Sequence, residues 1–535
     1  MGLNLATALI DSAVQYPNHP AIICDDRQTT FEELDHWSAR IGEILLTQGL
    51  RRGDNVMLLA PNVPEFTAAY FGILRVGGVV VPINTLLLER EIADLLEHSD
   101  AKYFIAWHGH AEKCLAAFEA VESCVNLFFI GASREQLPES ILAHYASSPL
   151  HRPTKFVLDE LLTHVPGTVD CVQTNADDTA VILYTSGTTG KPKGAELSHF
   201  NIFTNSLYTK EKILYISRDS VTIAVLPLFH TFGQTVIQNA SILTGATIVM
   251  VPQFEPKRLL GEIEKRRVTC IAAVPTMFNF MVQTQRRKAF DTSSLKVAVS
   301  GGASLPVALH REFEEVFGFQ LVEGYGLSET SPITNVTPAD GSVNKPGSIG
   351  PALFGTQVRV MRDDGTFAEV DEIGELVVRG HNVMKGYYKD PRATEATFTN
   401  GWFRTGDVAR MDEDRYFYIV DRKKDVIIRA GMNIYPREVE EVLHRHPAVR
   451  EVSVVGMPDE TLSESVVAFV VLAEGQHVTA DALQKYCRDH LAVFKCPKSV
   501  VFMEQLPKGP TGKILKRELR NFPGKFQAPF PLGEG

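Results

Sequence analysis

Hydrophobic and polar positions alternate in blocks along the first part of the chain. Short apolar runs at 21–23, 56–59, 78–82 and 128–130 predict buried strands, and the segments between them have helical periodicity. The sequence Thr30-Phe31-Glu32-Glu33 has the spacing of a capping box and predicts the start of a helix. Strand and helix in this order predict an α/β fold with a largely parallel sheet.

The rest of the chain predicts two smaller units. Glycines separate short β-rich runs over residues 349–378, which indicates a small barrel-like subdomain. The last residues, about 110 in number, alternate helix and strand patterns and have the size of a compact α+β domain. A charged segment beginning at Asp421 lies between two apolar runs and is typical of a linker. We therefore expect a large N-terminal domain over residues 1–420 and a small C-terminal domain over 421–535.

Composition narrows the class of protein. The chain has 535 residues, of which 44% are hydrophobic, so it has ample apolar content for a large core and is too long for a single one. The net charge of -11 argues against a nucleic-acid binder that relies on phosphate neutralisation. The 7 cysteines form no C-x-x-C pair and predict reduced thiols in a cytoplasmic protein. The N-terminus does not have the pattern of a secretory signal, and the most apolar stretch, 71–83, is too short to span a membrane. Peripheral membrane contact and a homodimer stay open.

The candidate chemistry centres on the segment from Tyr184 to Gly194, which follows the apolar run 179–183. Glycines let the backbone approach an anion, while hydroxyls and lysines donate to it. The spacing is not that of a Walker A loop, because two residues stand where four are needed and Pro192 replaces Ser or Thr. A flexible surface turn is the alternative, but the position after a buried strand favours a nucleotide. The residues concerned are Thr185, Ser186, Gly187, Thr188, Thr189, Gly190, Lys191 and Lys193.

Four more motifs follow. Residues 224–233 predict a strand that ends in an aromatic and histidine cluster around His230, and 300–303 predict a loop of small residues after a strand. Residues 323–330 read Glu-Gly-Tyr-Gly-Leu-Ser-Glu-Thr, which lacks the third glycine of a dinucleotide fingerprint. Asp407 lies in a Gly-bounded turn. Taken singly, these could be a satisfied core histidine, a tight turn, a weak Rossmann match and an Asx-turn.

Together the segment 184–194 and these motifs resemble the adenylate-forming superfamily, which includes acyl-CoA synthetases, adenylation domains of peptide synthetases and beetle luciferases. The resemblance runs along the whole chain. It implies that the 184–194 segment holds the phosphates of ATP and that His230 lies beside the acyl substrate. It also implies that Tyr325 stacks on adenine, that Thr330 contacts the α-phosphate and that Glu329 helps hold Mg²⁺, a cation suited to carboxylate and phosphate oxygens. The other residues implied at the nucleotide are Gly302, Ala303, Glu323, Gly324 and Gly326.

The same resemblance assigns roles in the second half of the chain. Asp407 would accept hydrogen bonds from both ribose hydroxyls, as a carboxylate can, and Arg422 would reach the nucleotide. Asp421 would be the hinge of a mobile C-terminal domain, and Gly431 would lie where the pantetheine arm of CoA passes. Lys513, in a Pro/Gly loop that would ordinarily be solvated, falls on the catalytic lysine of the family. The catalytic residues implied are thus Lys513, Thr185, Glu329 and His230.

The implied reaction has two steps. A carboxylic acid attacks ATP to give an acyl-adenylate and pyrophosphate, and the acyl group then passes to the thiol of CoA. The segment from Leu226 to Pro252 looks most like that of fatty acyl-CoA ligases, so we expect a medium- or long-chain fatty acid, with an aryl acid as the alternative. A ligase that loads a carrier protein is a further alternative, although such ligases typically have an insertion before the hinge and 404–421 is short.

Overall fold

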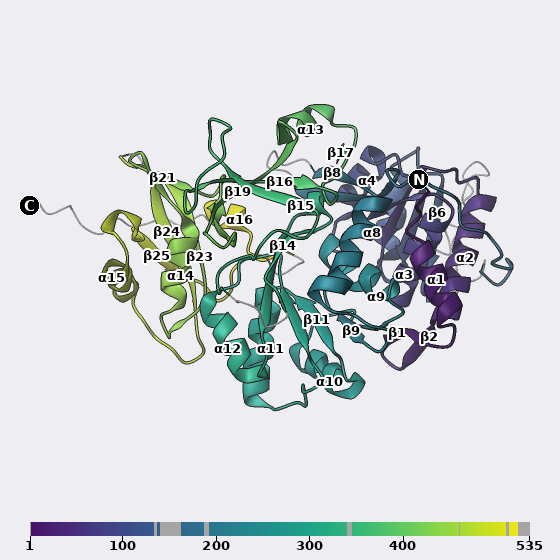
Figure 1. The fold of residues 1–535 in the computed structure, drawn as a ribbon, viewed down its shortest axis with the longest axis horizontal. Coiled ribbons are helices and arrows are strands. Elements are labelled where there is room, and N and C mark those ends of the chain that lie inside the picture. Colours follow the sequence, from purple (N-terminus) through teal and green to yellow (C-terminus); the bar gives the residue numbers. More distant parts are fainter. Residues whose placement is uncertain are drawn as a thin grey trace, which may run out of the picture.

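The computed structural model describes residues 2–132, 136–139, 162–186, 192–339, 345–459, 461–509 and 513–522. Its strands form four sheets, two large and two small. In Figure 1 the large sheets lie at the centre and right, and the sheet of the C-terminal part lies at the left. No helix among the described residues is long and apolar enough to cross a membrane.

The first large sheet has the order β17-β8-β7-β4-β3-β5-β6. Its central pairs, from β7 through β4, β3 and β5 to β6, are parallel, as predicted. Short apolar runs form these strands because both of their faces are covered. The strands are β3 (Asn55–Leu59), β4 (Val79–Pro82), β5 (Tyr103–Trp107), β6 (Asn126–Ile130), β7 (Thr179–Ser186), β8 (Pro192–Ser198) and β17 (Gly386–Tyr387), and the helices along this stretch are α3 (Pro64–Arg75), α4 (Glu89–His98), α5 (Ala111–Glu119), α8 (His199–Tyr208) and α13 (Pro391–Thr397).

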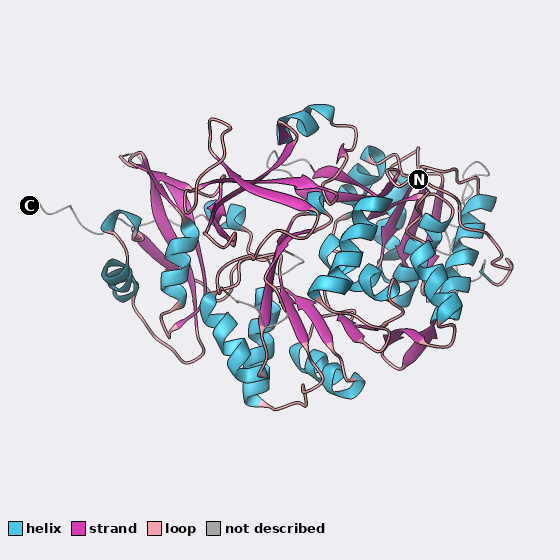
Figure 2. Ribbon diagram, viewed as in Figure 1, coloured by secondary structure: helices cyan, strands magenta, loops and turns pink. Residues whose placement is uncertain are grey.

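The second large sheet has the order β14-β13-β12-β11-β9-β10-β1-β2. The predicted capping box is present, with Thr30 accepting from the backbone of Glu33 at the start of α2. The strands are β1 (Pro20–Cys24), β2 (Arg27–Thr30), β9 (Val221–Ala224), β10 (Thr247–Met250), β11 (Cys270–Ala273), β12 (Val297–Ser300), β13 (Leu321–Gly326) and β14 (Ile333–Val336). The helices are α1 (Thr7–Gln15), α2 (Phe31–Thr47), α9 (Ala240–Ile242), α10 (Pro256–Arg266), α11 (Pro275–Arg287) and α12 (Val307–Phe317). Figure 2 shows these helices against the strands.

Helix α3 joins the two large sheets into one core. Every one of its residues is buried, and the Thr67 hydroxyl donates to the Gln238 side chain at 2.7 Å. Just before the helix, Asn62 donates to the carbonyls of Ala224 and Leu226 on the second sheet. The side chains of Thr67 and Asn62 therefore cross between the two sheets with hydrogen-bond partners, as burial requires.

One predicted strand is shorter than its pattern. The strand predicted over 224–233 ends at Ala224, where β9 ends, and a π-helix, η4 (Phe232–Asn239), begins a few residues later. Pro227 lies between them and has no N–H to donate to a strand ladder, so the ladder cannot continue. His230 therefore lies in a loop before a helix and not at the end of a strand.

The two smaller sheets follow in the sequence. The curled sheet over residues 356–422 has the order β15-β16-β19-β18, with β20 on β19, and confirms the predicted barrel-like subdomain. The last sheet has the order β22-β21-β24-β23, with β25 on β24, and confirms the small α+β unit. These elements are β15 (Thr356–Met361), β16 (Gly374–Gly380), β18 (Phe398–Thr399), β19 (Trp402–Met411), β20 (Phe417–Arg422), β21 (Ile427–Arg429), β22 (Met432–Ile434), α14 (Pro436–His444), β23 (Val449–Asp459), β24 (Ser463–Leu472), α15 (Ala480–His490), β25 (Ser499–Phe502) and α16 (Lys516–Arg520).

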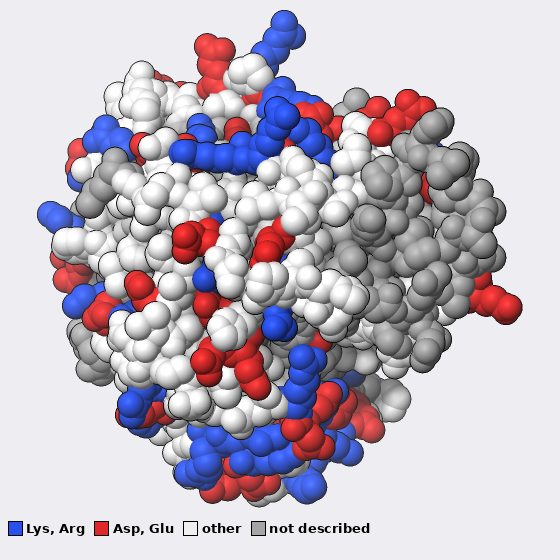
Figure 3. Space-filling view, turned by 90° about the vertical axis from the view of Figure 1, so that its right-hand side faces the viewer, with Lys and Arg blue, Asp and Glu red and all other residues white. Residues whose placement is uncertain are grey.

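The junction between these two sheets is short. Asp421 and Arg422 are the last residues of β20, where they pair with β19, and β21 begins at Ile427 in the last sheet. Residues 423–426 therefore connect the two parts. On the face drawn in Figure 3, groups of basic side chains lie beside acidic ones, so the described part of this face presents no continuous basic surface.

Candidate active site

The segment predicted to hold phosphates is a β-hairpin. Strand β7 runs through Ser186, and β8 returns antiparallel from Pro192, with Thr185 opposite Lys193 and Ser186 opposite Pro192. The hairpin geometry places the Thr185 hydroxyl and the Lys193 amine on adjacent strands. The residues between the strands, Gly187, Thr188, Thr189, Gly190 and Lys191, lie outside the described residues.

Glu329 lies at the base of this hairpin. It belongs to a short 3-10 helix, η5 (Ser328–Thr330), and its Oε1 is 3.5 Å from the Thr185 hydroxyl and 3.0 Å from the Tyr387 hydroxyl, which donates to it. The Lys193 amine lies 5.1 Å from the centre of the Tyr387 ring. The hydroxyl of Thr330 donates to the Pro332 carbonyl at 2.6 Å and so closes its own turn.

Tyr387 is a site residue that sequence reasoning missed. It belongs to the two-residue strand β17, which pairs with β8, about 200 residues away in sequence. No spacing motif marks it, and only the pairing of Tyr387 with Ala195 brings its hydroxyl to the Glu329 carboxylate.

The loop after β12 and the end of β13 form a narrow wall where the resemblance places adenine. Gly302 has a φ of +77°, a conformation that favours glycine. A Cβ on Gly301 would lie 3.0 Å from the Phe232 ring, and one on Gly326 would lie 1.9 Å from the Pro332 carbonyl oxygen. Ala303 and Gly324 line the same cleft. Small residues are thus required by close contacts at 301 and 326.

Tyr325, Asp407 and Arg422 meet although they are distant in sequence. The Tyr325 hydroxyl donates to Asp407 Oδ2 at 2.5 Å, and Arg422 Nε lies 3.3 Å from Asp407 Oδ1. Burial, followed by the Asp407 charge, raises the pKa of the Tyr325 hydroxyl well above its ordinary value, so the hydroxyl remains a donor. Both oxygens of the buried Asp407 carboxylate face cleft-lining side chains.

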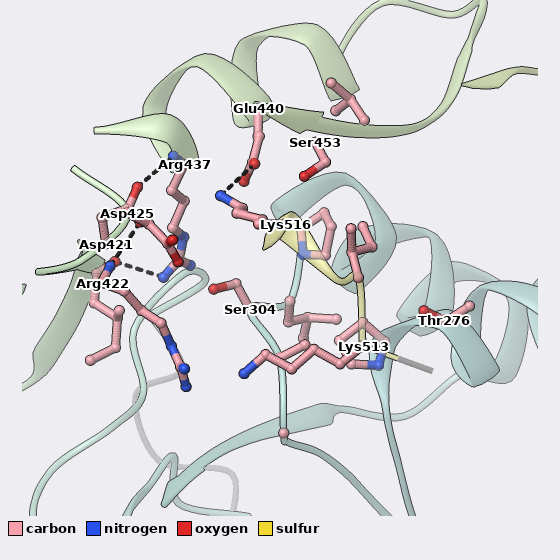
Figure 4. Close-up of a pocket in the computed structure, with 18 of the residues that line it drawn as sticks. Thr276, Ser304, Asp421, Arg422, Asp425, Arg437, Glu440, Ser453, Lys513 and Lys516 are labelled. Atoms are coloured by element: carbon pink, nitrogen blue, oxygen red, sulfur yellow. Dashed lines mark hydrogen bonds and ion pairs between the residues drawn. The ribbon is translucent and has the colours of Figure 1, made fainter. Parts of the chain in front are cut away.

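Lys513 enters the same cleft from the C-terminal part. Figure 4 shows its side chain and that of Arg422 extending toward each other. Burial and then the like charge of Arg422 lower the pKa of Lys513 to about 8, while the Asp407 carboxylate opposes this shift. A lysine with this pKa keeps its charge at neutral pH yet can lose it under mildly basic conditions.

His230 lies close enough to Lys513 to sense its charge. Burial and then Lys513 lower the pKa of His230 to about 4. Its Nδ1 accepts from the backbone N–H of Phe232 at 3.2 Å, so the neutral ring carries its proton on Nε2. His230 is therefore a neutral donor at physiological pH.

Glu323 is a second unusual carboxyl at this wall. It is buried and accepts one hydrogen bond, from the Leu305 N–H at 3.3 Å. Burial raises its pKa to about 7, and the opposite charge of Arg437 works against this rise. Its charge at neutral pH therefore depends on Arg437, which comes from the C-terminal part.

Glu323, Tyr325, Asp407, Arg422 and Lys513 line one cleft of about 770 Å³ between the second large sheet and the C-terminal part. Thr185, Lys193, Glu329 and His230 are not among the residues that line it. Of the predicted nucleotide residues, Gly302, Ala303, Glu323, Gly324, Tyr325, Gly326, Asp407, Arg422 and Lys513 line it. Gly431 does not: it lies in the exposed turn between β21 and β22, with a φ of +80° and open space around its α-carbon. The structure thus brings most of the residues predicted at the nucleoside into one cleft, and Gly431, the residue predicted at CoA, lies outside it.

The donor set around Glu329 suits Mg²⁺. Oxygen ligands from a carboxylate, with hydroxyls beside it, match a hard cation that completes its shell with substrate phosphates and water. Among the described residues, no three His, Cys, Asp or Glu side chains form a group that could hold a metal by themselves. A metal ion here would therefore complete its coordination with phosphate oxygens.

Two family models match the chain. That of the AMP-binding enzyme covers residues 9–388, and that of the AMP-binding enzyme C-terminal domain covers 438–513. The chain is 36% identical over 530 residues to the long-chain-fatty-acid–CoA ligase of Bacillus subtilis (strain 168), which covers 96% of this chain and 94% of that relative. It is 35% identical over 504 residues to the feruloyl-CoA synthase of Amycolatopsis sp, covering 94% of this chain and 96% of that relative.

A solved structure adds the arrangement of the parts. The chain superposes on ATP-bound MatB from Rhodopseudomonas palustris with a TM-score of 0.87 at 30% identity, covering 97% of this chain and 99% of that one. Apo MatB, at the same identity and coverage, gives a TM-score of 0.75. The overall arrangement is therefore closer to the ATP-bound form than to the apo form.

Fold and site together define an adenylate-forming enzyme. The chain belongs to the AMP-binding enzyme family. This confirms the resemblance found in the sequence and the predicted enzyme class, an AMP-forming acid–CoA ligase. The identity of the acid and the roles of single residues are separate questions.

Proposed function

We propose that the protein activates a medium- or long-chain fatty acid with ATP and transfers the acyl group to CoA. The observation that carries this proposal is the meeting of Lys513 with Tyr325, Asp407 and Arg422 in one cleft, in a chain that matches a fatty-acid ligase along its length.

In the first step the carboxylate oxygen attacks the α-phosphorus of ATP, a P–O bond forms, and the bond to the pyrophosphate leaving group breaks. Two anions approach each other, so the enzyme's task is positioning and compensating charge. Lys513 supplies a cation on a flexible side chain, and Asp407 with Tyr325 holds the nucleoside. Thr185, Ser186 and Lys193 lie on the two strands of the hairpin. Together with the residues of its turn, they would hold the phosphates. The Thr330 hydroxyl now donates to the Pro332 carbonyl, so it would have to give up this hydrogen bond to contact the α-phosphate.

Mg²⁺, when bound, would neutralise phosphate charge, and Glu329 would be its protein ligand. Tyr387 and Thr185 orient the Glu329 carboxylate. His230, whose proton lies on Nε2, would donate to an acyl substrate beside it.

In the second step the CoA thiol attacks the acyl carbon and AMP leaves. Gly431 lies outside the present cleft, so a CoA path along it requires the C-terminal part to turn about the junction at 421–426. We propose Asp421 as the hinge and 1–420 and 421–535 as the two domains. Such a motion is a gating step that can limit turnover.

The acid is inferred from the elements on which the acyl group would lie. Helices α8 and η4 pack together, with the Ser206 hydroxyl 3.4 Å from the Thr235 carbonyl. Their sequences contain no Asp, Glu, Lys or Arg, so neither offers a fixed charge for a second ionised group on the acid. This favours a monocarboxylic acid. The similarity to a feruloyl-CoA synthase makes an aryl acid the second candidate.

The CoA acceptor is favoured over a carrier protein by the region before the hinge. Strands β19 and β20 are joined directly by residues 412–416, without an inserted element. A homodimer and peripheral membrane contact stay predictions.

The test is a mass-spectrometric end-point assay of the purified full chain with Mg-ATP, a graded series of fatty and aryl acids, and CoA. We expect acyl-CoA and AMP with fatty acids, and their loss in Lys513→Ala. Lys508→Ala is the matched control, because this lysine of the same loop pairs with Glu451 at 2.7 Å within the C-terminal part. It should retain turnover.

Three results would change the proposal. Acyl-CoA from aryl acids alone would replace the fatty acid by the second candidate. Acyl-AMP that forms but never passes to CoA would point to a carrier protein. Turnover that survives Lys513→Ala would remove Lys513 from its role.

A further inference from the structure

Arg437 lines the cleft and lies where helix α14 packs against strand β20. It is the second residue of α14, on the C-terminal part, and it is buried. In Figure 4 its backbone and its side chain both face the end of β20, where Asp421 and Arg422 lie. It was not among the residues that the sequence singled out.

Two hydrogen bonds from Arg437 reach β20, one at the proposed hinge residue and one, from the side chain, on the N-terminal side of it. Its backbone N–H donates to Asp421 Oδ2 at 2.9 Å, and its Nη1 donates to the Ile419 carbonyl at 2.6 Å. Asp421 and Ile419 belong to β20, on the far side of residues 423–426. These bonds therefore exist only while α14 lies against β20.

A purely local role for this side chain does not account for these contacts. Its Nε pairs with Glu441 at 3.1 Å, four residues on, as an ordinary helix-surface pair would. That pair leaves Nη1 directed at the Ile419 carbonyl. The positive charge of the same guanidinium also opposes the rise in the pKa of Glu323 on β13 that burial causes, so its charge acts on a second strand of the N-terminal part.

Helix α14 is in turn tied to the loop that carries Lys513. Glu440, three residues after Arg437, pairs with Lys516 at 2.8 Å. Lys516 starts α16, three residues after Lys513, and the Leu515 N–H donates to the Pro507 carbonyl at 2.9 Å. A shift of α14 away from β20 would therefore carry Lys513 with it.

We propose that Arg437 is a positioning residue for the adenylation step: it clamps α14 to β20 and so holds Lys513 in the nucleotide cleft. It acts through Lys513 and not on the substrates. The clamp must open before the C-terminal part can present Gly431, so it favours the first half-reaction at the expense of the second. This inference rests on the proposed two-step function.

The experiment measures the two half-reactions separately on the full-length protein. ATP–pyrophosphate exchange with the best acid of the panel reports adenylation, and transfer from isolated acyl-AMP to CoA reports the second step. In Arg437→Gln we expect exchange to fall about ten-fold or more, because a charge-assisted hydrogen bond is strong enough to shift a two-state balance by that factor. Transfer should be unchanged or faster. Arg437→Lys, which keeps a charged donor, should restore part of the exchange rate.

Arg362→Gln is the matched control. Arg362 has the same kinds of partner, the Phe367 carbonyl at 2.5 Å and the Glu372 carboxylate at 2.5 Å, but all of them lie within the curled sheet region. Its loss should not separate the two half-reactions.

A structural measurement accompanies the kinetics. X-ray scattering of the protein with Mg-ATP should show the wild type in the arrangement described here and Arg437→Gln partly displaced from it. Equal loss of both half-reactions, no loss of either, or unchanged scattering would overturn the inference. A wild type that adenylates none of the acids would instead refute the proposed function, so the two failures are distinct.

Discussion

The charge of Lys513 should set the upper pH limit of the adenylation step. Burial and the neighbouring Arg422 lower its pKa to about 8. In the proposed mechanism the ammonium is the active form, so kcat/KM for ATP should be highest below pH 8 and fall above it. The quantity kcat/KM reports the free enzyme, in which this pKa applies.

The size of the effect follows from the pKa. Between pH 8 and pH 9.5 the charged fraction of a lysine with a pKa of about 8 falls about fifteen-fold, whereas a lysine at its ordinary pKa would lose only about a tenth. The assay is initial-rate ATP–pyrophosphate exchange at limiting ATP across this range. Buffers of constant ionic strength and a stability check at each pH serve as controls.

Substitutions of Asp407 and Arg422 should move the alkaline limb of the pH profile, where kcat/KM falls, in opposite directions. Asp407→Asn removes the charge that supports the ammonium, so the limb should move below pH 8, and Arg422→Gln should move it above. The position of the limb is compared, and not the absolute rate, because both variants should also weaken nucleotide binding. A limb near pH 10 in the wild type, or one that neither variant moves, would refute the reasoning.

Stability offers an independent reading of the same pKa. A lysine whose pKa is lowered on folding destabilises the folded state while it is charged, and this destabilisation is complete below about pH 8. The free energy of unfolding of the wild type should therefore rise between pH 8 and 10.5, the ordinary pKa of the lysine. Lys513→Met should therefore raise the stability of the nucleotide-free protein at pH 7 by up to about 3 kcal/mol, measured by thermal unfolding. The variant should lack the rise with pH, and an equally steep rise would contradict this account.

Two further predictions concern the wall of the cleft and the base of the β7–β8 hairpin. Gly326→Ala should lower the free energy of unfolding by about 1–3 kcal/mol, because its Cβ would lie 1.9 Å from the Pro332 carbonyl oxygen. Gly261→Ala, at a position with open space around it, is the control in thermal unfolding. Equal melting temperatures of the two variants would contradict the prediction. Tyr387→Phe removes the donor to Glu329 and should weaken the Mg²⁺-dependent part of ATP affinity by about ten-fold or more. Calorimetric titration of ATP with and without Mg²⁺ measures this, and an unchanged difference would show that Tyr387 does not orient the carboxylate.

Local patterns predicted much of the fold because local physics dominates there. The parallel strands of the first sheet are apolar on both faces, and the Thr30 capping box satisfies its own backbone donors, so each is readable from a few residues. The motifs predicted at the nucleotide were recognised through their resemblance to a family, and the structure gives the physical reason for a glycine such as Gly326, where an added Cβ would meet the backbone. The strand predicted through His230 was wrong beyond Ala224, because hydrophobicity alone does not show where Pro227 interrupts the ladder.

The sequence by itself determined which residue types the chemistry requires: a lysine near the C-terminus, a Gly-Tyr-Gly segment, an aspartate in a Gly-bounded turn and an arginine beside the junction. Only the tertiary structure decided which of them meet. Tyr387 reaches Glu329 through a pairing of strands distant in sequence, and Arg437 reaches β20 only because α14 docks there. Such contacts depend on the placement of whole elements, and no local pattern of hydrophobic and polar residues encodes that placement.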